Sequence, residues 1–339
     1  MLRLLVAAQE FPLKLKLMKK QLLFTLLVIT LLYTFSACQP AATQATLTSK
    51  FGSSVYDDGL NFYVANDLGR NGYFKQKPIA ELMGNMADSL DIEFVALAGD
   101  CHHFNGVQST ADPLWMTNFE TIYSHPDLMI DWFPILGNHE YRGNTDAVLD
   151  YSKISRRWVM PARYYTKVIP ETDDHASLTI LFIDTTPLMK EYWSEPDKYP
   201  DVQKQDTARQ LAWMDSVLTV SATKFNIVIG HHPIYVSEKK RADAPSLIAS
   251  LDPILRKHQV DFYIAGHSHT FQHLRKEGSV VNYVVNASAS LGREPIKGPD
   301  TQFCSSDEGF SVMSLGKNEL KMSFINYKGE AIHQIVAQK

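Results

Sequence analysis

Cysteine is scarce in this chain, and neither sign of charge is concentrated in a block. Only three cysteines occur in 339 residues, and 33 Lys and Arg are interspersed with 37 Asp and Glu. If Cys38 belongs to an N-terminal leader, Cys101 and Cys304 remain as free thiols or as one pair, too few for a disulfide framework. The mixed charges indicate no basic groove for a nucleic acid and no acidic tail. The 45% hydrophobic content is typical of a globular protein with one large domain or two small ones.

The N-terminus has the pattern of a secretory signal. The basic Lys19-Lys20 precedes the apolar run Leu22 to Tyr33, and the small residues Ser36-Ala37 then precede Cys38. This ending resembles a bacterial lipobox, so we expect export to the periplasm or the cell surface, with Cys38 lipidated and tethered to the membrane. A plain signal peptide or a single membrane anchor is the alternative, although the run is short for a membrane span.

The signal divides the chain into three parts. Residues Met1 to Leu17 precede a better start, which suggests a misplaced initiation codon. We assign 1–38 to the N-terminal extension and signal, 39–55 to a polar linker, and 56–339 to one folded domain.

Within this domain, apolar runs typical of strands alternate with amphipathic stretches typical of helices. The runs are Asn61 to Asn66, Phe94 to Ala98, Trp132 to Leu136, Leu178 to Ile183, Phe225 to Ile229, Asp261 to Ala265 and Asn282 to Val285. The helical stretches are Pro78 to Leu90, Asp206 to Leu218 and Ser246 to His258. The tail from Phe310 to Val336 alternates as closing hairpins do. The alternation predicts an α/β fold.

Six of the apolar runs end in polar residues that could bind a ligand. They are Asn66-Asp67, Gly99-Asp100, Gly137-Asn138-His139-Glu140, Asp184, Gly230-His231-His232 and Gly266-His267-Ser268-His269. In an open α/β sheet, the residues at the carboxyl ends of the strands share one crevice, so we expect these segments to converge.

Each segment alone has an ordinary explanation, such as a turn carboxylate at Asp67 or capped core histidines at His231-His232. His267 and His269, two positions apart, would face the same way in extended backbone, which suits chelation. Together the segments supply the mixed oxygen and nitrogen ligands that two metal ions need, and such a pair can clamp a phosphoryl group.

This order of motifs resembles the calcineurin-like metallophosphoesterase superfamily, and more specifically the small, tartrate-resistant type of purple acid phosphatase. The similarity covers roughly residues 60 to 330. The matching segments are Phe104 to Gln108, Gly137 to Glu140, Tyr151 to Trp158 and Gly266 to His269. The resemblance implies a four-layer α-β-β-α sandwich with two mixed sheets and a di-metal site at the strand ends.

The resemblance also implies a ligand set. The first metal would be held by Asp67, His103 and His269, the second by Asn138, His231 and His267, and Asp100 would bridge the two. His139 would face the substrate and donate a proton to the leaving oxygen or steady the phosphate.

The chain departs from the family pattern at two places that affect the site. The iron-binding tyrosine, whose charge transfer to ferric iron colours these enzymes, falls at His103, so we expect a divalent pair of iron, zinc or manganese and no purple colour. His102 would face away from His103 and lie behind the site or in solvent. A second histidine of the family is replaced by Glu238-Lys239-Lys240-Arg241.

The expected function is hydrolysis of a small phosphate monoester by attack of a metal-bound hydroxide, as in an acid phosphatase, with Asp100 and His139 as catalytic residues. A phosphodiesterase or nucleotide pyrophosphohydrolase is an alternative, in which Lys239 to Arg241 bind a second phosphate. A surface lipoprotein that binds a metal or a ligand without turnover is a third hypothesis. The sequence does not specify the oligomeric state.

Overall fold

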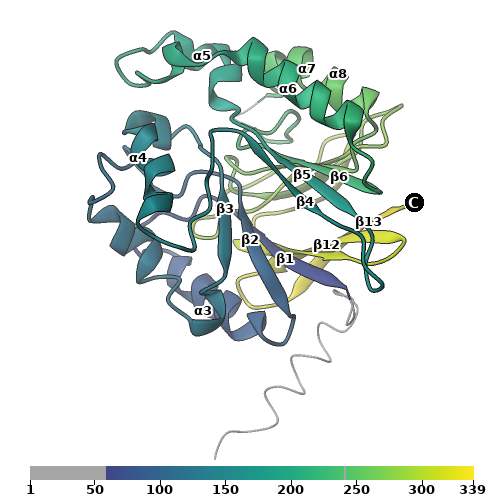
Figure 1. Ribbon diagram of the computed structural model, residues 1–339, viewed down its shortest axis with the longest axis horizontal. Helices are drawn as coiled ribbons and strands as arrows, with labels where there is room; N and C mark the ends of the chain where they lie inside the picture. Colours follow the sequence, from purple (N-terminus) through teal and green to yellow (C-terminus); the bar gives the residue numbers. More distant parts are fainter. Residues whose placement is uncertain (1–58, 240–241) are drawn as a thin grey trace, which may run out of the picture. The chain divides into compact units, whose positions relative to one another are not determined.

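The computed structural model describes residues 59–239 and 242–339, which contain two mixed β-sheets (Figure 1). The first sheet has the order β13 (Ala331–Gln338), β12 (Glu319–Asn326), β11 (Gly309–Leu315), β1 (Leu60–Ala65), β2 (Ile92–Leu97) and β3 (Asp131–Pro134). The second has the order β10 (Thr301–Ser305), β8 (Phe271–Leu274), β9 (Asn282–Val285), β7 (Phe262–Ala265), β6 (Phe225–Ile229), β5 (Leu178–Phe182) and β4 (Tyr165–Ile169).

Each sheet combines a block of parallel strands with antiparallel strands. Strands β1, β2 and β3 run parallel, as do β5, β6, β7 and β9. The side chains of β5 are buried on both faces, which explains why its sequence is nearly continuous in apolar residues. In the first sheet, Phe62 of β1 stacks on Phe94 of β2 with ring centroids 4.5 Å apart. Apolar packing thus fixes the parallel strands whose carboxyl ends carry the candidate site.

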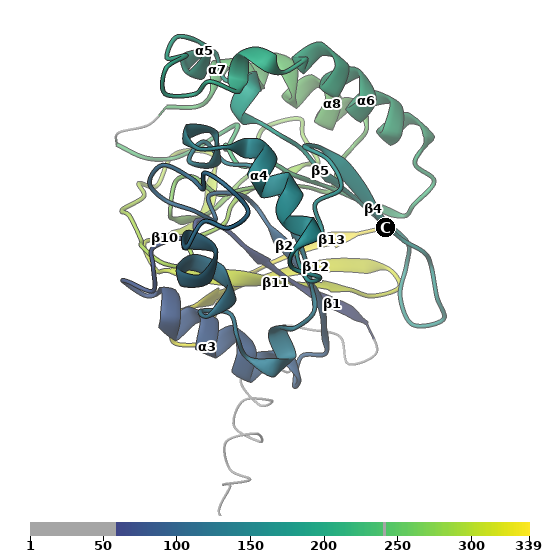
Figure 2. The same ribbon diagram turned by 60° about the vertical axis from the view of Figure 1, so that its left-hand side comes forward.

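The helices flank the sheets on their outer faces (Figures 1 and 2). They are α3 (Gln76–Ala87), α4 (Thr145–Asp150), α5 (Lys190–Trp193), α6 (Thr207–Val220), α7 (Pro245–Ser250) and α8 (Asp252–Lys257). Helices α6 to α8 lie beyond the second sheet and α3 beyond the first, which agrees with the predicted four-layer α-β-β-α sandwich. Asp206 caps the start of α6, because its side chain accepts a hydrogen bond from the amide of Arg209.

The predicted helix from Ser246 to His258 is wrong as a single element. It is broken at Leu251 into α7 and α8, and Pro253 stands in the first turn of α8. Proline has no amide proton and disfavours helical backbone in the residue before it, so it starts a new helix more readily than it continues one. The closing hairpins are confirmed as β11 to β13.

The predicted boundaries at residues 38 and 55, and the lipobox at Cys38, lie outside the described residues. None of the helices that the structure describes is long and apolar enough to cross a bilayer.

Candidate metal centre

The loops that follow five parallel strands bring the predicted site residues together. Asp67 follows β1, Asp100 and His103 follow β2, and Asn138 follows β3 in the first sheet. His231 follows β6, and His267 and His269 follow β7 in the second sheet. All seven predicted metal ligands therefore lie at the edge where the two sets of parallel strands end.

The first group of candidate ligands consists of Asp67, His103 and His269, whose ligand atoms lie within 4.8 Å of one another. Nε2 of His269 is 3.0 Å from Oδ1 of Asp67, and Nε2 of His103 is 3.9 Å from the same oxygen. All three residues are buried.

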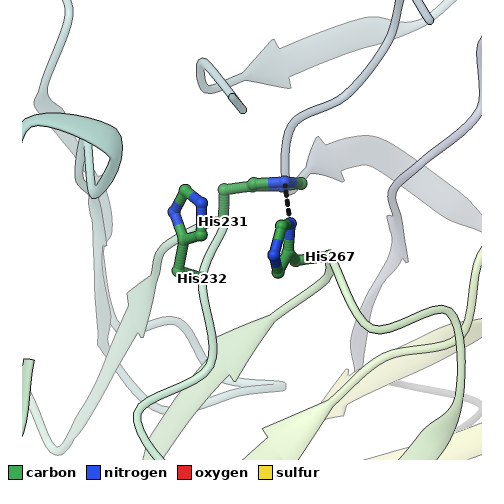
Figure 3. A group of neighbouring side chains, drawn as sticks. All are labelled: His231, His232 and His267. Carbon is green, nitrogen blue, oxygen red and sulfur yellow. Dashed lines mark hydrogen bonds between the residues drawn. The ribbon is translucent and has the colours of Figure 1, made fainter. Parts of the chain in front are cut away.

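The second group consists of Asn138, His231 and His267. Nε2 of His231 lies 3.3 Å from Oδ1 of Asn138 and 3.3 Å from Nδ1 of His267. Figure 3 shows the ring of His267 turned toward His231, with a dashed line joining the two nitrogens.

Asp100 lies between the two groups. Its Oδ2 is 3.5 Å from Nε2 of His103 in the first group and 3.2 Å from Nε2 of His231 in the second. Its other oxygen, Oδ1, accepts a hydrogen bond of 3.0 Å from the amide of His139. The amide thus orients the carboxylate so that Oδ2 faces both groups, as a bridging ligand requires.

Backbone carbonyls fix the orientation of three of the imidazoles. Nδ1 of His103 is 3.1 Å from the carbonyl of Gly69, and Nδ1 of His231 is 2.9 Å from that of Ala98. Nδ1 of His269 is likewise 2.9 Å from the carbonyl of Leu291. A carbonyl only accepts, so each Nδ1 carries a proton and donates it. The Nε2 lone pairs are therefore directed at the carboxylates of Asp67 and Asp100, which is the arrangement of metal-ligating histidines.

This donor set fits cations. Oδ1 of Asp67 and Nε2 of His103 are buried without a hydrogen-bond partner in the described chain. A lone pair facing a carboxylate oxygen is repulsive unless a proton or a metal ion lies between them. Burial lowers the pKa of His231, but the attraction of Asp100 outweighs it and raises the pKa to about 9. A metal ion bound there would take the place of the proton that His231 otherwise holds toward Asp100.

Four of the candidate ligands have left-handed backbone conformations. The φ angles are 53° at Asp67, 53° at Asp100, 66° at His267 and 58° at His269. The extended backbone predicted for the His267 to His269 pair is therefore wrong. Residues other than glycine adopt this conformation at a cost, and such strain is typical of functional sites. Each loop turns sharply at its ligand, which brings the two sheets' ligands to one place.

Glycines allow these turns to pack closely. A Cβ atom at Gly99 would come 2.7 Å from Nδ1 of His231, and one at Gly266 would come 2.6 Å from Oδ2 of Asp67. Any side chain at either position would displace a candidate ligand.

Glu140 joins the loops after β2 and β3 from behind. Its buried carboxylate accepts hydrogen bonds from the amides of Asp100 (2.9 Å), Gly137 (2.8 Å) and His102 (3.0 Å). The sequence motif placed Glu140 next to the site without indicating this contact. Its role is visible only in three dimensions, because its partners are amides rather than side chains.

His139 and Asp100 border a pocket of about 580 Å³. Nδ1 of His139 donates to the carbonyl of Phe104 at 2.7 Å, and its Nε2 lies 3.9 Å from Oδ2 of Asp100. Burial lowers the pKa of His139. The pocket is also lined by His232, which belongs to the predicted segment Gly230-His231-His232. Four further lining residues were not singled out from the sequence, namely Arg142, Tyr192, Tyr199 and Arg293. Their loops carry no motif that would have identified them.

Some polar residues at the strand ends do not join the site. The ring of His102 packs against Trp115, 4.4 Å between centroids, and His102 belongs to none of the candidate ligand groups in the described residues. It is buried rather than in solvent. Asp184 after β5 accepts a hydrogen bond from the hydroxyl of Tyr141.

Cys101 and Cys304 are both free thiols in the structure. Of the basic loop considered for a second phosphate, Lys240 and Arg241 lie outside the described residues.

Comparisons with known proteins show the family to which the chain is related. The model of the calcineurin-like phosphoesterase family matches residues 60–271. Purple acid phosphatase 3 of Arabidopsis thaliana is 30% identical over 308 residues, 86% of this chain and 81% of that protein. Tartrate-resistant acid phosphatase type 5 of Oryctolagus cuniculus is 30% identical over 62% of this chain and 66% of its own length.

A solved structure described as GAP50, the anchor in the inner membrane complex of Plasmodium, has a similar fold. Its TM-score is 0.72 at 25% identity, over 83% of this chain and 89% of that chain. The family model covers more than half of the chain, and the plant relative matches most of it. The chain therefore belongs to the calcineurin-like phosphoesterase family, and within it is similar to the purple acid phosphatases.

Proposed function

We propose that this protein is a di-metal hydrolase that cleaves small phosphate monoesters. The observation that carries the proposal is the position of Asp100. Its Oδ2 lies 3.2 Å from Nε2 of His231, 3.5 Å from that of His103 and 3.9 Å from that of His139. One carboxylate oxygen thus faces both candidate ligand groups and the histidine that borders the pocket.

In this proposal Asp67, His103 and His269 hold the first ion, Asn138, His231 and His267 hold the second, and Asp100 contacts both. The mixed nitrogen and oxygen donors suit divalent iron, zinc or manganese. When bound, such a pair activates water and neutralises charge on a phosphoryl group.

The chain's own residues then position the substrate and move a proton. The carbonyl of Phe104 holds the ring of His139 so that Nε2 is directed toward the pocket and Asp100. In its protonated form, this nitrogen can give a proton to the leaving oxygen of the ester. Arg142 and Arg293 line the same pocket and add positive charge that attracts a phosphorylated substrate.

The His139→Ala variant tests this function. We expect it to retain both metal ions, because His139 is not among the proposed ligands, and to lose about 100-fold or more in kcat on alkyl phosphates. Metal content by elemental analysis and a panel of aryl and alkyl monoesters and diesters would be measured on wild type and variant. A metal-loaded wild type that hydrolyses no phosphate ester would overturn the proposal, and faster turnover of diesters would favour the diesterase alternative.

A non-catalytic role is the second candidate, because the neighbour with the TM-score of 0.72 is described as an anchor. In that case the site would hold metal for structure or binding only. The orientation of His139 toward the pocket supports catalysis instead, since a purely structural metal site is closed and needs no polar group facing a cavity.

We also propose that Cys38 is lipidated and tethers the protein to a membrane after export. The support is the order of basic, apolar and small residues before Cys38. Replacing Cys38 by serine should move the protein from the membrane fraction to the soluble fraction, because acyl chains hold a protein to a bilayer by hydrocarbon burial. Unchanged fractionation of the variant, with no lipid mass on the wild type, would contradict the tether.

A further inference from the structure

A chain of three hydrogen-bonding side chains forms one wall of the pocket. Nδ1 of His232 lies 2.9 Å from Oγ1 of Thr185, and Nε2 of His232 lies 2.8 Å from the hydroxyl of Tyr192. All three residues are buried, and His232 and Tyr192 line the pocket that His139 borders. None of the three belongs to the proposed ligand set.

The direction of each hydrogen bond follows from Thr185. Its hydroxyl oxygen already accepts the amide protons of His231 (3.1 Å) and His232 (3.0 Å). With both lone pairs used, the hydroxyl donates its own proton to Nδ1 of His232. The ring then carries its proton on Nε2 and donates it to the oxygen of Tyr192. The phenolic proton of Tyr192 is therefore not used in the hydrogen bonds among these three side chains. It is directed to an acceptor other than His232.

The middle residue of this chain, His232, lies beside the second group of candidate ligands. The ring of His232 lies 4.5 Å from that of His267, centroid to centroid, and one of its nitrogens lies within 4.8 Å of ligand atoms of His231 and His267. Figure 3 shows the His232 ring next to the His231 and His267 pair but not joined to it. Both nitrogens of His232 are engaged by hydroxyls, so the ring is placed to orient a neighbour rather than to ligate.

We propose that Tyr192 donates its hydroxyl proton to a non-bridging phosphoryl oxygen of the bound substrate, and that His232 and Thr185 are positioning residues that fix this donor. The inference rests on the proposed function and identifies a second substrate contact in the pocket that His139 lines. A phosphoryl oxygen carries negative charge and accepts a stronger hydrogen bond than a neutral oxygen. A bound phosphoryl group can therefore replace the acceptor to which the Tyr192 hydroxyl donates when no substrate is bound.

The contact makes a prediction that differs from that for His139. A hydrogen bond to a non-bridging oxygen is present for every ester and for inorganic phosphate, so its loss is independent of the leaving group. A proton donor to the leaving oxygen matters most for alkyl esters, whose leaving groups are poor. The two roles thus separate in a comparison of aryl with alkyl phosphates.

The test is the Tyr192→Phe variant of the metal-loaded protein, with inorganic phosphate as the probe. We expect phosphate to bind about tenfold more weakly, and kcat/KM to fall by a similar factor for 4-nitrophenyl and alkyl phosphates, with metal content unchanged. The matched control is Tyr63→Phe, which removes a buried hydroxyl that donates to the carbonyl of Met83 at 3.0 Å, away from the pocket. His232→Phe should give a smaller loss, since the hydroxyl remains but its direction is no longer fixed.

Phosphate binding within twofold of wild type in Tyr192→Phe would overturn the inference, as would a loss confined to alkyl esters or a wild type that binds no phosphate. Calorimetry measures phosphate binding without turnover. A wild type that binds phosphate more tightly than Tyr192→Phe but hydrolyses no ester would therefore refute the proposed function and leave the Tyr192 contact supported.

Discussion

The Asp100→Asn variant should lose both metal ions and at least about a thousandfold in hydrolysis, because two cations share this one carboxylate. The amide of His139 donates to Oδ1 of Asp100. An asparagine would keep its oxygen at that amide and turn its NH₂ group toward His103 and His231. The atom that faces both ligand groups would then be a donor without charge, which cannot bind a cation.

Elemental analysis of the purified variant measures this loss. His267→Ala is the comparison, since it removes a ligand of the second group only and should lose one ion preferentially. Asp184→Asn is the matched control, because Asp184 is also a buried acid at a strand end but is hydrogen-bonded to Tyr141 away from both ligand groups. Full occupancy in Asp100→Asn, or an equal loss in Asp184→Asn, would contradict the bridging role.

Much of the fold could be predicted because most residues of the parallel strands are buried on both faces of their sheets. The run Phe225 to Ile229 reads as a strand for this reason and matches β6 residue for residue. The sequence does not predict β4 and β10, which are the two edges of the second sheet, or β8, which pairs with β10. Their sequences mix polar with apolar residues, as at Thr301–Ser305. Edge pairing depends on the neighbouring strand as much as on the strand's own sequence.

Most of the candidate ligands could be found because they stand close after an apolar run, whereas His103 was indicated only by the family resemblance. The backbone conformation at these ligands could not be predicted. His267 and His269 converge through left-handed turns at 66° and 58° rather than through extended backbone. The favourable contacts that offset these turns, such as the amide of His267 bonded to Asp67 at 2.8 Å, join residues 200 positions apart.

The hydrogen-bonded side chains beside the pocket could not be predicted from the sequence either. Tyr192 lies in α5 and His232 in the loop after β6, and nothing in either segment indicates that their polar atoms are 2.8 Å apart. Thr185 completes the chain only because β5 and β6 are paired neighbours. Motifs thus identified the candidate metal ligands, whereas the groups proposed to contact the substrate depend on how separate loops pack.

The identity of the metals is decided largely at position 103, where the resemblance places a tyrosine. Burial lowers the pKa of His103 to about 3, so the imidazole is neutral. Asp67 and Asp100 are then the two anions around the first ion, where a tyrosinate would make a third. Less negative charge stabilises a trivalent ion less, which favours a divalent pair. The wild type should therefore show no strong visible band.

The His103→Tyr variant, loaded with iron in air, should gain a visible charge-transfer band that the wild type lacks. The substitution places a phenolate beside Oδ1 of Asp67 and Oδ2 of Asp100, from which Nε2 of His103 is now 3.9 Å and 3.5 Å away. Absorption spectra of both proteins, with iron content measured on the same samples, decide the matter. His103→Phe is the control, since phenylalanine is similar in shape to tyrosine but has no hydroxyl.

A strong band in the wild type would mean that another tyrosine reaches the metal. Tyr192 and Tyr199 are the tyrosines that line the pocket. The assignment of His103 as the first ion's ligand would then be wrong, because the third anion would come from that tyrosine instead.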